Sequence, residues 1–395
     1  MLVSSRKASV RQLDTNAGFD PTDLAALESG SVTPANTPTT ANSLGLDILA
    51  NDVGYVATVQ MGTPPRDFLI LMDSGSSDLW VGAEECQSLT TPGADCVSDS
   101  DQLAFATLIP LNMQGDHTFL GTKSSSSFVD TNQTFNVTYG TGAVVGDIIQ
   151  DTLVVAGLQL SDHTFGVASQ ETDEFTGASF DGLMGLAQSS LSRQRTLTPV
   201  ESLAKAGLIP AAITSYKISR LSDNKNDGEI TFGALDTTKF NQATLTNLNN
   251  VNNLGFWEAK IDAVTVDGKD LGFNDRTAIL DTGTTLLIVP DADAQAIHQQ
   301  IPGAKSTQNN GIFTIPCTTN ASLALVFGGN SFAIQPSDLT FRPVDPNNLT
   351  GDCVSGISSG TINGPTVWLV GDVFLKNAYF STNVDLNTIQ LAQLT

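Results

Sequence analysis

Two short stretches of the chain share one pattern, in which an apolar run ends in an aspartate. Residues 68–77 place Asp73 after Phe-Leu-Ile-Leu-Met, and residues 278–285 place Asp281 after Ala-Ile-Leu. In both, the aspartate is followed by a hydroxyl residue, a glycine and two more hydroxyl residues. The repeat predicts two similar halves that meet at a pair of carboxyl groups. Two carboxyls within hydrogen-bonding range do not both ionise readily, so they share a proton and can activate water while protonating a leaving group.

The composition limits the partners that the chain can bind. It has 395 residues, 40 % of them hydrophobic, which is enough for two or more buried cores. Lys and Arg number 18 against 41 Asp and Glu, and the net charge is −23. The absence of a basic run argues against nucleic acid as a partner, since nothing would neutralise the phosphates. The acidity fits solubility alone, or an adaptation to acid in which few bases limit positive charge at low pH.

The four cysteines form two clusters along the chain and allow three disulfide connectivities. If the two aspartates mark separate halves, the local pairings Cys86–Cys96 and Cys317–Cys353 are favoured. Four glycosylation sequons begin at Asn132, Asn136, Asn320 and Asn348. The even cysteine count and the sequons together favour an oxidising, secretory route.

No stretch approaches the ~20 apolar residues of a membrane span, so no membrane partner is expected. Residues 1–20 also lack the apolar core of a signal peptide. Either the protein is cytosolic or the chain lacks its true N-terminus, and the cysteines and sequons favour the second explanation. We therefore expect a secreted, extracellular protein, with the vacuole as the alternative location.

The chain divides into three predicted regions. Residues 1–44 are expected to form a propeptide-like segment, with a short helix over 20–27 and a Thr-, Pro-, Ala- and Asn-rich linker over 31–43. We expect cleavage within 30–50, although residues 1–44 have a net charge of −1 and would not pair by charge with an acidic cleft. A hydrophilic run over 222–228 suggests an N-terminal lobe at 45–222 and a C-terminal lobe at 223–395.

From residue 54 onward, short apolar runs alternate with Gly, Asn and Asp, which predicts a largely β protein. Two helices are also expected. One begins with the capping box of Thr198 and Glu201 and ends at Gly207, and the other covers 291–300. Residues 83–130 are predicted to be a long irregular insertion. The expected strands include 54–60, 67–72, 135–139, 152–156, 229–232, 278–280 and 367–370.

Five motifs, in order, resemble those of the pepsin-like aspartic endopeptidases, and more loosely the secreted enzymes of fungi. The resemblance covers about residues 50–395. It implies an all-β, bilobal fold, with two pseudo-symmetric lobes, an active-site cleft between them and a few short helices. The implied partners are polypeptide substrates, and nothing in the sequence suggests a cofactor, a metal site or an oligomer. The motifs are DSGSSDLW at 73–80, YGTG at 139–142, FDGLMGLA at 180–187, DTGTT at 281–285 and WLVGDVF at 368–374.

The resemblance assigns catalysis to the two aspartates and support to the residues that follow them. Gly75 and Gly283 allow a tight turn that presents each carboxylate without a Cβ clash. Ser74 and Thr282 are implied to direct their hydroxyls across the lobe interface. Because the family usually has Thr at the first position, Ser74 is a departure that keeps the hydroxyl but loses a methyl, and slight loosening is expected.

Further motif residues receive roles in the same way. Ser76 and Thr284 are placed to hydrogen-bond the outer carboxylate oxygens, which favours the ionised form and helps to hold one charge on the pair. The segments around Gly185 and Gly371 are expected to form a second strand beneath each active-site loop, as scaffold only.

A third group of residues is expected to bind substrate. The resemblance implies that Tyr139, Gly140 and Thr141 lie on a β-hairpin flap that closes over the cleft. Trp80 is implied to donate its indole N–H to the flap tyrosine and steady it. Phe175 is a candidate pocket-lining residue.

Other chemistries fit the sequence poorly. The glycine-rich run 140–146 has the wrong final spacing for a dinucleotide loop and no following helix. His117, His163 and His298 lie in no recognisable triad context, so a serine nucleophile is disfavoured. His298 is expected to be a surface residue of the second helix. No His, Cys and Asp spacing indicates a metal site.

Two functions follow from these patterns. The first is an aspartic endopeptidase that works at acidic pH through two aspartates and an activated water, with a preference for apolar or aromatic residues around the scissile bond. The alternative is a non-catalytic, pepsin-like protein that binds or inhibits polypeptides. The intact aspartates and flap tyrosine favour the first.

Overall fold

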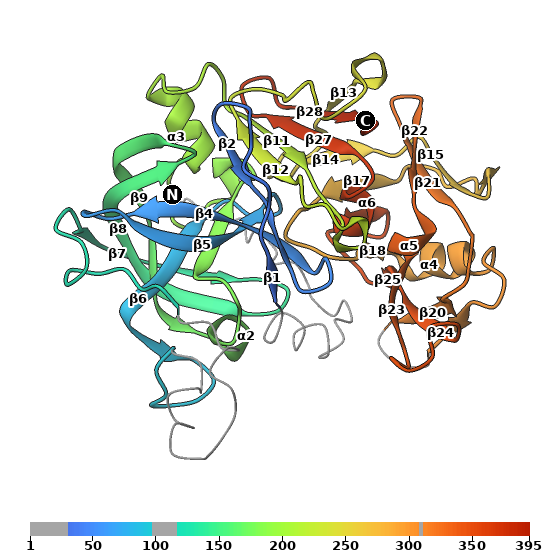
Figure 1. Ribbon diagram of the computed structural model, residues 1–395, viewed down its shortest axis with the longest axis horizontal. Coiled ribbons are helices and arrows are strands. Elements are labelled where there is room, and N and C mark those ends of the chain that lie inside the picture. Colours follow the sequence, from blue (N-terminus) through green and yellow to red (C-terminus); the bar gives the residue numbers. More distant parts are fainter. Residues whose placement is uncertain (1–30, 97–116, 308–310) are drawn as a thin grey trace, which may run out of the picture.

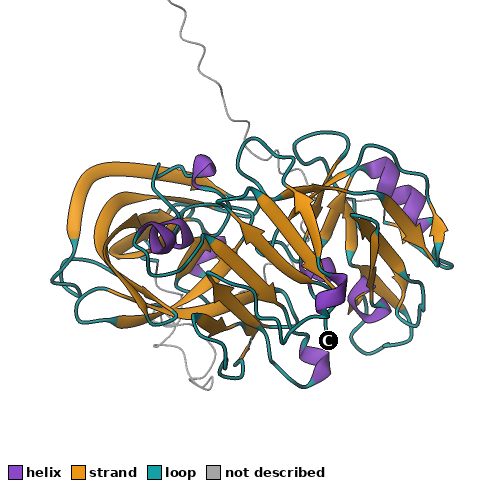
Figure 2. Ribbon diagram, turned by 90° about the horizontal axis from the view of Figure 1, so that it is seen from above, coloured by secondary structure: helices purple, strands orange, loops and turns teal. Residues whose placement is uncertain are grey.

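The computed structural model describes residues 31–96, 117–307 and 311–395. Most of the regular secondary structure in both halves is β-strand, and the helices are short (Figure 2). The all-β, bilobal prediction is therefore confirmed. The helix expected over 20–27 and most of the predicted propeptide-like segment lie outside the described residues.

The N-terminal half is built on one nine-stranded sheet, whose strands run from blue to green in Figure 1. Its strands alternate buried and exposed positions or are buried on both faces, as expected where a sheet wraps around a core. In spatial order the strands are β1 (Val32–Thr33), β3 (Asp47–Leu49), β4 (Gly54–Met61), β5 (Arg66–Asp73), β10 (Gly182–Gly185), β6 (Leu79–Ser88), β9 (Leu158–Glu171), β8 (Ala143–Val155) and β7 (Val129–Thr138).

A six-stranded sheet joins the two halves. Figure 1 shows β27 and β28 (red) beside β11 and β12 (yellow-green) in the region between them. One hydrophobic cluster also includes buried residues from both halves. The strands, in order, are β13 (Thr246–Asn249), β28 (Thr388–Ala392), β27 (Tyr379–Asn383), β11 (Ile213–Lys217), β12 (Glu229–Phe232) and β2 (Ser43–Gly45).

The C-terminal half contains three smaller sheets (orange in Figure 1). The first has the order β14 (Glu258–Lys260), β17 (Thr277–Leu280), β26 (Val367–Val370), β18 (Leu287–Val289) and β25 (Ile357–Ser359). The second has β16 (Lys269–Asp270), β15 (Ala263–Val266), β21 (Leu323–Phe327) and β22 (Asn330–Ile334), and the third has β19 (Lys305–Ser306), β20 (Phe313–Pro316), β24 (Asp352–Ser355) and β23 (Thr340–Pro343).

Each half contains the same three-strand unit behind its aspartate. In the first half, β10 pairs in parallel with β5 and antiparallel with β6. In the second, β26 pairs in parallel with β17 and antiparallel with β18. The second strand expected beneath each active-site loop is therefore present in both halves, and it fixes the end of each aspartate-bearing strand from one side.

Both predicted helices are present, and the first has the expected capping box. In α3 (Pro199–Lys205) the Thr198 side chain accepts from the Glu201 N–H, and the Glu201 carboxylate accepts from the Thr198 N–H at 2.8 Å. The second predicted helix, α4 (Asp291–His298), ends two residues before its expected end. The other α-helices described are α2 (Asp173–Thr176), α5 (Pro336–Leu339) and α6 (Asp372–Leu375), and the 3-10 turns are Ser189–Leu191, Leu221–Asp223 and Gln242–Thr244.

Several expectations about loops need correction. The predicted linker over 31–43 is not a free connection, because β1 pairs with β3 and the chain enters β2, which pairs with β12. The hydrophilic run 222–228 connects β11 and β12, which are neighbours in the shared sheet, so the chain does not leave that sheet there. Within 83–130, β6 continues to Ser88 and β7 begins at Val129, while 97–116 lie outside the described residues.

The predicted position of His298 on the surface is wrong. Its side chain is buried on the inner face of α4, where Nδ1 lies 2.7 Å from the Ala294 carbonyl and Nε2 lies 2.9 Å from the Ser355 hydroxyl. The ring stacks on Phe313 with centroids 4.0 Å apart. Burial lowers the pKa of His298 to about 4, so the histidine is a neutral core residue above that pH.

Both predicted disulfides are present, Cys86–Cys96 in the first half and Cys317–Cys353 in the second. The second joins β24 to the residue that follows β20. Among the described residues, no helix has the length and apolar character needed to cross a membrane.

The N-cap of α3 offers a test of the local analysis. Thr198→Ala removes the hydroxyl that accepts from the Glu201 N–H, and it should lower the free energy of unfolding by about 1 kcal/mol. Thr196→Ala is the matched control, because Thr196 lies outside the helix and its hydroxyl makes no hydrogen bond in the described structure. Urea unfolding of both variants measures the difference, and equal losses would contradict the capping role.

Candidate active site

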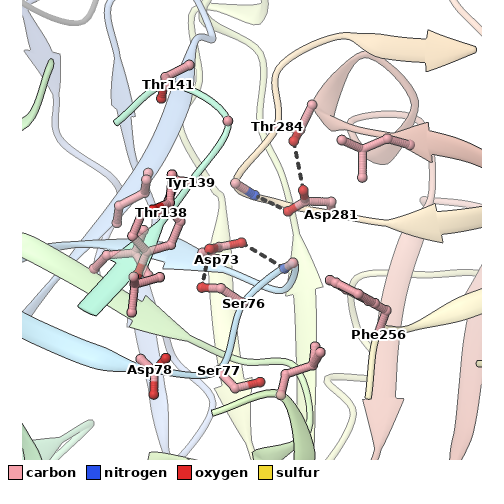
Figure 3. Close-up of a pocket in the computed structure, with 18 of the residues that line it drawn as sticks. Asp73, Ser76, Ser77, Asp78, Thr138, Tyr139, Thr141, Phe256, Asp281 and Thr284 are labelled. Carbon is pink, nitrogen blue, oxygen red and sulfur yellow. Dashed lines mark hydrogen bonds between the residues drawn. The ribbon is translucent and has the colours of Figure 1, made fainter. Parts of the chain in front are cut away.

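The two repeated aspartates lie face to face between the halves (Figure 3). Asp73 is the last residue of β5, and Asp281 follows β17 directly. The backbone at each position is tied to the neighbouring strand segment, since the Leu186 N–H donates to the Asp73 carbonyl and the Asp281 N–H donates to the Val370 carbonyl. The two residues are 5 % and 8 % exposed, so both carboxyl groups lie in a largely desolvated environment.

Matching donors surround the two carboxyl groups. The Gly75 N–H donates to Asp73 Oδ1 at 2.7 Å, and the Ser76 hydroxyl donates to Oδ2 at 2.5 Å. On the other side, the N–H of Gly283 and the hydroxyl of Thr284 contact Asp281 at 2.9 and 2.7 Å (Figure 3). These contacts stabilise ionised carboxylate and fix the orientation of each group.

Close approach explains the glycine in each motif. A Cβ placed on Gly75 would lie 2.4 Å from the Asp281 carboxyl, and one on Gly283 would lie 2.5 Å from Asp73 Oδ1. Neither glycine has a positive φ, so any residue could adopt the backbone angle. Glycine is required here because each loop leaves no room for a side chain beside the opposite carboxyl group.

Two hydroxyl groups connect the aspartate loops across the halves. The Ser74 N–H donates to Thr282 Oγ1, and the Thr282 N–H donates to Ser74 Oγ, both at 3.0 Å. Each hydroxyl then donates to a backbone carbonyl on the opposite strand, from Ser74 to Leu280 at 2.9 Å and from Thr282 to Met72 at 2.7 Å. All four bonds are buried, and the Ser74 hydroxyl donates in one of them and accepts in another.

The environment favours one retained proton on the pair. Burial raises the pKa of Asp73 well above its usual range, the charge of Asp281 raises it further, and a hydrogen bond between the two carboxyls acts in the same direction. Donation from Ser76 and Gly75 opposes the shift without cancelling it. The proton belongs to the coupled pair and not to one carboxyl group.

The hairpin of β7 and β8 carries Tyr139 over the cleft. The turn closes with the Tyr139 N–H donating to the Gly142 carbonyl at 2.7 Å. The indole N–H of Trp80 donates to the tyrosine hydroxyl at 2.8 Å, as the resemblance implied, and Phe175 packs edge-on against both rings. Burial raises the pKa of Tyr139 well above its usual range, so the phenol stays neutral.

A cavity of about 200 Å³ lies between the aspartates and this hairpin. The predicted residues Tyr139, Gly140, Thr141 and Phe175 all line it, whereas Trp80 lies behind Tyr139. Sequence analysis gave no substrate-binding role to a largely apolar group from both halves, because most of these residues lie outside the five motifs and the other two, Leu183 and Leu369, were expected to be scaffold. They are Leu71, Val137, Leu183, Leu191, Arg193, Leu254, Phe256, Ile288, Ile362 and Leu369.

One group of side chains among the described residues has the spacing of metal ligands, namely Cys86, Cys96 and Glu171. The two sulfur atoms are joined in a disulfide, so neither is the free thiolate that would bind a metal. The group therefore does not form a metal site in this state. The group includes Glu171, which is buried. Burial raises the pKa of its carboxyl group to about 8.

Comparison with known proteins identifies the family. Residues 54–394 match the model of the eukaryotic aspartyl protease family. The chain belongs to this family. It is 36 % identical to a "probable aspartic-type endopeptidase CTSD" of Arthroderma benhamiae over 91 % of this chain and 64 % of that protein. It is also 32 % identical to rhizopuspepsin of Rhizopus chinensis, over 87 % of this chain and 79 % of the relative.

A further relative within the aspartyl protease family is the "aspartic-type endopeptidase ctsD" of Aspergillus fumigatus, which is 32 % identical over 91 % of this chain and 69 % of its own length. The chain spans 64 % of the length of the Arthroderma benhamiae protein and of a similarly named protein from Trichophyton verrucosum.

The hydroxyl contacts between the loops generate a stability prediction. Thr282→Val keeps the shape of the side chain but leaves the Ser74 N–H and the Met72 carbonyl without their partner. Each buried unpaired group should cost about 1–3 kcal/mol in the free energy of unfolding. Ser74→Thr, which retains the hydroxyl, is the control and should lose far less. Equal stability of Thr282→Val and the wild type in urea unfolding would refute the contribution of these contacts.

Glu171 generates a second, pH-dependent prediction. Between pH 4.5 and 8 the folded protein keeps this proton while the unfolded chain has lost it, so stability falls as pH rises, by about 1.4 kcal/mol per pH unit. Glu171→Gln should lack this contribution, so its free energy of unfolding relative to that of the wild type should be higher at pH 7 than at pH 4.5. Glu174→Gln, a partly exposed carboxyl nearby in α2, is the control. Unfolding midpoints across this pH range that keep the wild-type slope in Glu171→Gln would contradict the burial argument.

Proposed function

We propose that this chain is an aspartic endopeptidase that hydrolyses peptide bonds of polypeptides at acidic pH. The observation that carries the proposal is the symmetric setting of Asp73 and Asp281. Each is buried, each accepts from one backbone N–H and one hydroxyl, and each carboxyl group lies against the glycine of the opposite loop. The names of the relatives support the same class of reaction.

The proposed mechanism uses the two carboxyl groups in complementary protonation states. The ionised carboxylate takes a proton from a water molecule as that water attacks the peptide carbonyl, and the protonated carboxyl donates its proton to the developing oxyanion. In the resulting gem-diol, the carboxyl that took the proton from water gives it to the amine nitrogen, the other carboxylate takes back a hydroxyl proton, and the C–N bond breaks to release a carboxylic acid and an amine. No covalent acyl-enzyme forms. Ser76 and Thr284 would hold the carboxyl groups in position through the cycle.

The lining of the cleft supports a preference for apolar or aromatic side chains around the scissile bond. Phe175 and Leu183 contribute apolar surface from the first half, and Phe256, Ile288 and Leu369 from the second. Burial of apolar substrate side chains against this surface would provide binding energy and exclude water from the carboxyl pair. Closure of the hairpin that carries Tyr139 would complete the site.

The cellular setting belongs to the same proposal. Asn132, Asn136, Asn320 and Asn348 are all exposed, as glycosylation requires, and the two disulfides suit an oxidising compartment. We therefore propose a secreted or vacuolar, glycosylated enzyme that acts as a monomer and is made as a zymogen. Removal of an N-terminal segment by cleavage within residues 30–50 stays a prediction, to be checked by N-terminal sequencing of the secreted form.

The decisive test is hydrolysis of denatured haemoglobin or casein from pH 2 to 7, with and without pepstatin. Acidic activity that pepstatin removes is expected, and it should fall as pH rises, because the pair then loses its shared proton. Asp73→Asn and Asp281→Asn should each abolish turnover while far-UV circular dichroism shows an intact fold. Asp275→Asn, at an exposed position, is the control and should retain activity.

The same variants separate the enzyme from the alternative, a non-catalytic pepsin-like binding protein. Proteolysis retained in both Asn variants would contradict the two-carboxyl mechanism. A saturable polypeptide-binding isotherm without cleavage at any acidic pH would favour the binding protein.

A further inference from the structure

We propose that Arg193 and Arg195, with Lys205 at the outer end, form a subsite for acidic side chains of an extended polypeptide substrate. We call these three residues the basic ridge. The inference rests on the proposed function and deepens it, because it assigns a charge preference to substrate positions outside the apolar centre of the cleft.

The basic ridge begins in the cleft itself. Arg193 lines the same cavity as Asp73 and Asp281. Among the described residues that line this cavity, it is the one basic residue. It also lines a second hollow beside the hairpin strand β7, which it shares with Arg195. Arg195 and Lys205 in turn line a third hollow next to α3. The three hollows therefore follow one another outward from the carboxyl pair, with an arginine common to each adjoining pair.

The backbone beneath the arginines is firmly held. Asp78 is 2 % exposed and accepts three hydrogen bonds, from the Ser192 hydroxyl at 2.6 Å and from the N–H groups of Arg193 and Gln194 at 2.9 and 3.0 Å. Asp78 lies five residues after Asp73, so one loop carries both the reacting carboxyl and the anchor of the arginine segment. The backbone that carries the two arginines is thus held in place relative to the reacting carboxyls.

The charges of the basic ridge have no internal partner. Arg193, Arg195 and Lys205 are exposed and make no ion pair with any residue that the structure describes. Other basic residues of this acidic chain are paired, such as Lys217 with Asp227 and Arg276 with Asp293. Asp162 is the one carboxylate that lines the third hollow, and none of the described carboxylates lines the second. Sequence analysis did not predict this local excess of positive charge, because the three basic residues do not form a continuous basic run.

An acidic polypeptide segment is the partner that this surface fits. Arginine presents donors in a planar fork that matches a carboxylate in two-point geometry. A substrate bound across the apolar cleft continues past it as an extended chain with side chains spaced about 3.3 Å per residue. Carboxylates a few residues from the scissile bond on one side would reach the basic ridge, and repulsion would disfavour Lys or Arg at those positions.

The test uses fluorogenic peptides with one constant apolar centre. A single Glu is placed at each of the four positions on either side of the scissile bond, and each peptide is matched by one with Gln at the same position. At pH 5, where a free Glu is mostly ionised, we expect Glu to raise kcat/KM over Gln by about 3- to 10-fold at one or two positions on one side only. The effect should appear mainly in KM and shrink in 0.5 M salt.

Variants assign the preference to the basic ridge. In Arg193→Gln/Arg195→Gln the Glu-to-Gln ratio should fall to about one, and in Arg193→Glu/Arg195→Glu a Lys-containing peptide should become the better substrate. Lys260→Gln is the control, since Lys260 is an exposed, unpaired cation that lines none of the three hollows, and it should keep the wild-type ratio. Because Asn136 borders the second hollow, all proteins are treated with endoglycosidase first.

Two results of the cleavage assay would overturn the inference. One is a Glu-to-Gln ratio near one at every position in the wild type, and the other is a preference that survives in Arg193→Gln/Arg195→Gln. A separate arm measures binding of the same peptide pairs to Asp73→Asn by fluorescence anisotropy. If the wild type shows no cleavage of any peptide, and Asp73→Asn nevertheless binds the Glu peptides more tightly than the Gln peptides, the proposed function fails and the role of the basic ridge is supported. Equal binding of both peptides there would reject the basic ridge even without turnover.

Discussion

The structure depends on holding two carboxyl groups in contact inside a largely desolvated cleft. Such an arrangement is costly for any fold, because two like charges cannot share a low-dielectric space. Two features of the structure offset this cost. Backbone N–H and hydroxyl donors stabilise the one negative charge, and a raised pKa retains one proton on the pair. Sharing one proton and one negative charge lowers the cost of burying the two carboxyl groups, and it also provides the acid and the base of the proposed reaction.

Keeping the carboxyl pair together requires the two halves to be fixed relative to one another. Three features act at different distances from the carboxyls. The hydroxyls of Ser74 and Thr282 connect the loops directly, the repeated three-strand units hold the strand ends, and the shared six-stranded sheet joins the two halves. Because the hydroxyl contacts are buried and reciprocal, a small displacement of either half would break several hydrogen bonds at once.

The surroundings of the carboxyl pair divide into two chemical zones. Next to it, apolar side chains from both halves exclude water and favour apolar substrate groups. Farther out, on the segment anchored by Asp78, the unpaired arginines provide a charged surface in an otherwise acidic molecule. In this arrangement the apolar zone would serve catalysis and the charged zone would select among substrates, because charge pairs at the rim act more on recognition than on the barrier.

The sequence by itself determined the elements whose cause is local. The two aspartate motifs, the capping box at Thr198, the strand pattern and the family resemblance all depend on residue types at fixed short spacings, and the structure has these elements where they were expected. Only the tertiary structure decided what depends on distant segments. It placed Phe256 in the cleft, buried His298 against Phe313, put the two ends of the expected linker into strands of two sheets and gathered Arg193 and Arg195 beside β7. These outcomes depend on packing between segments far apart in the chain, which leaves no periodic pattern to detect.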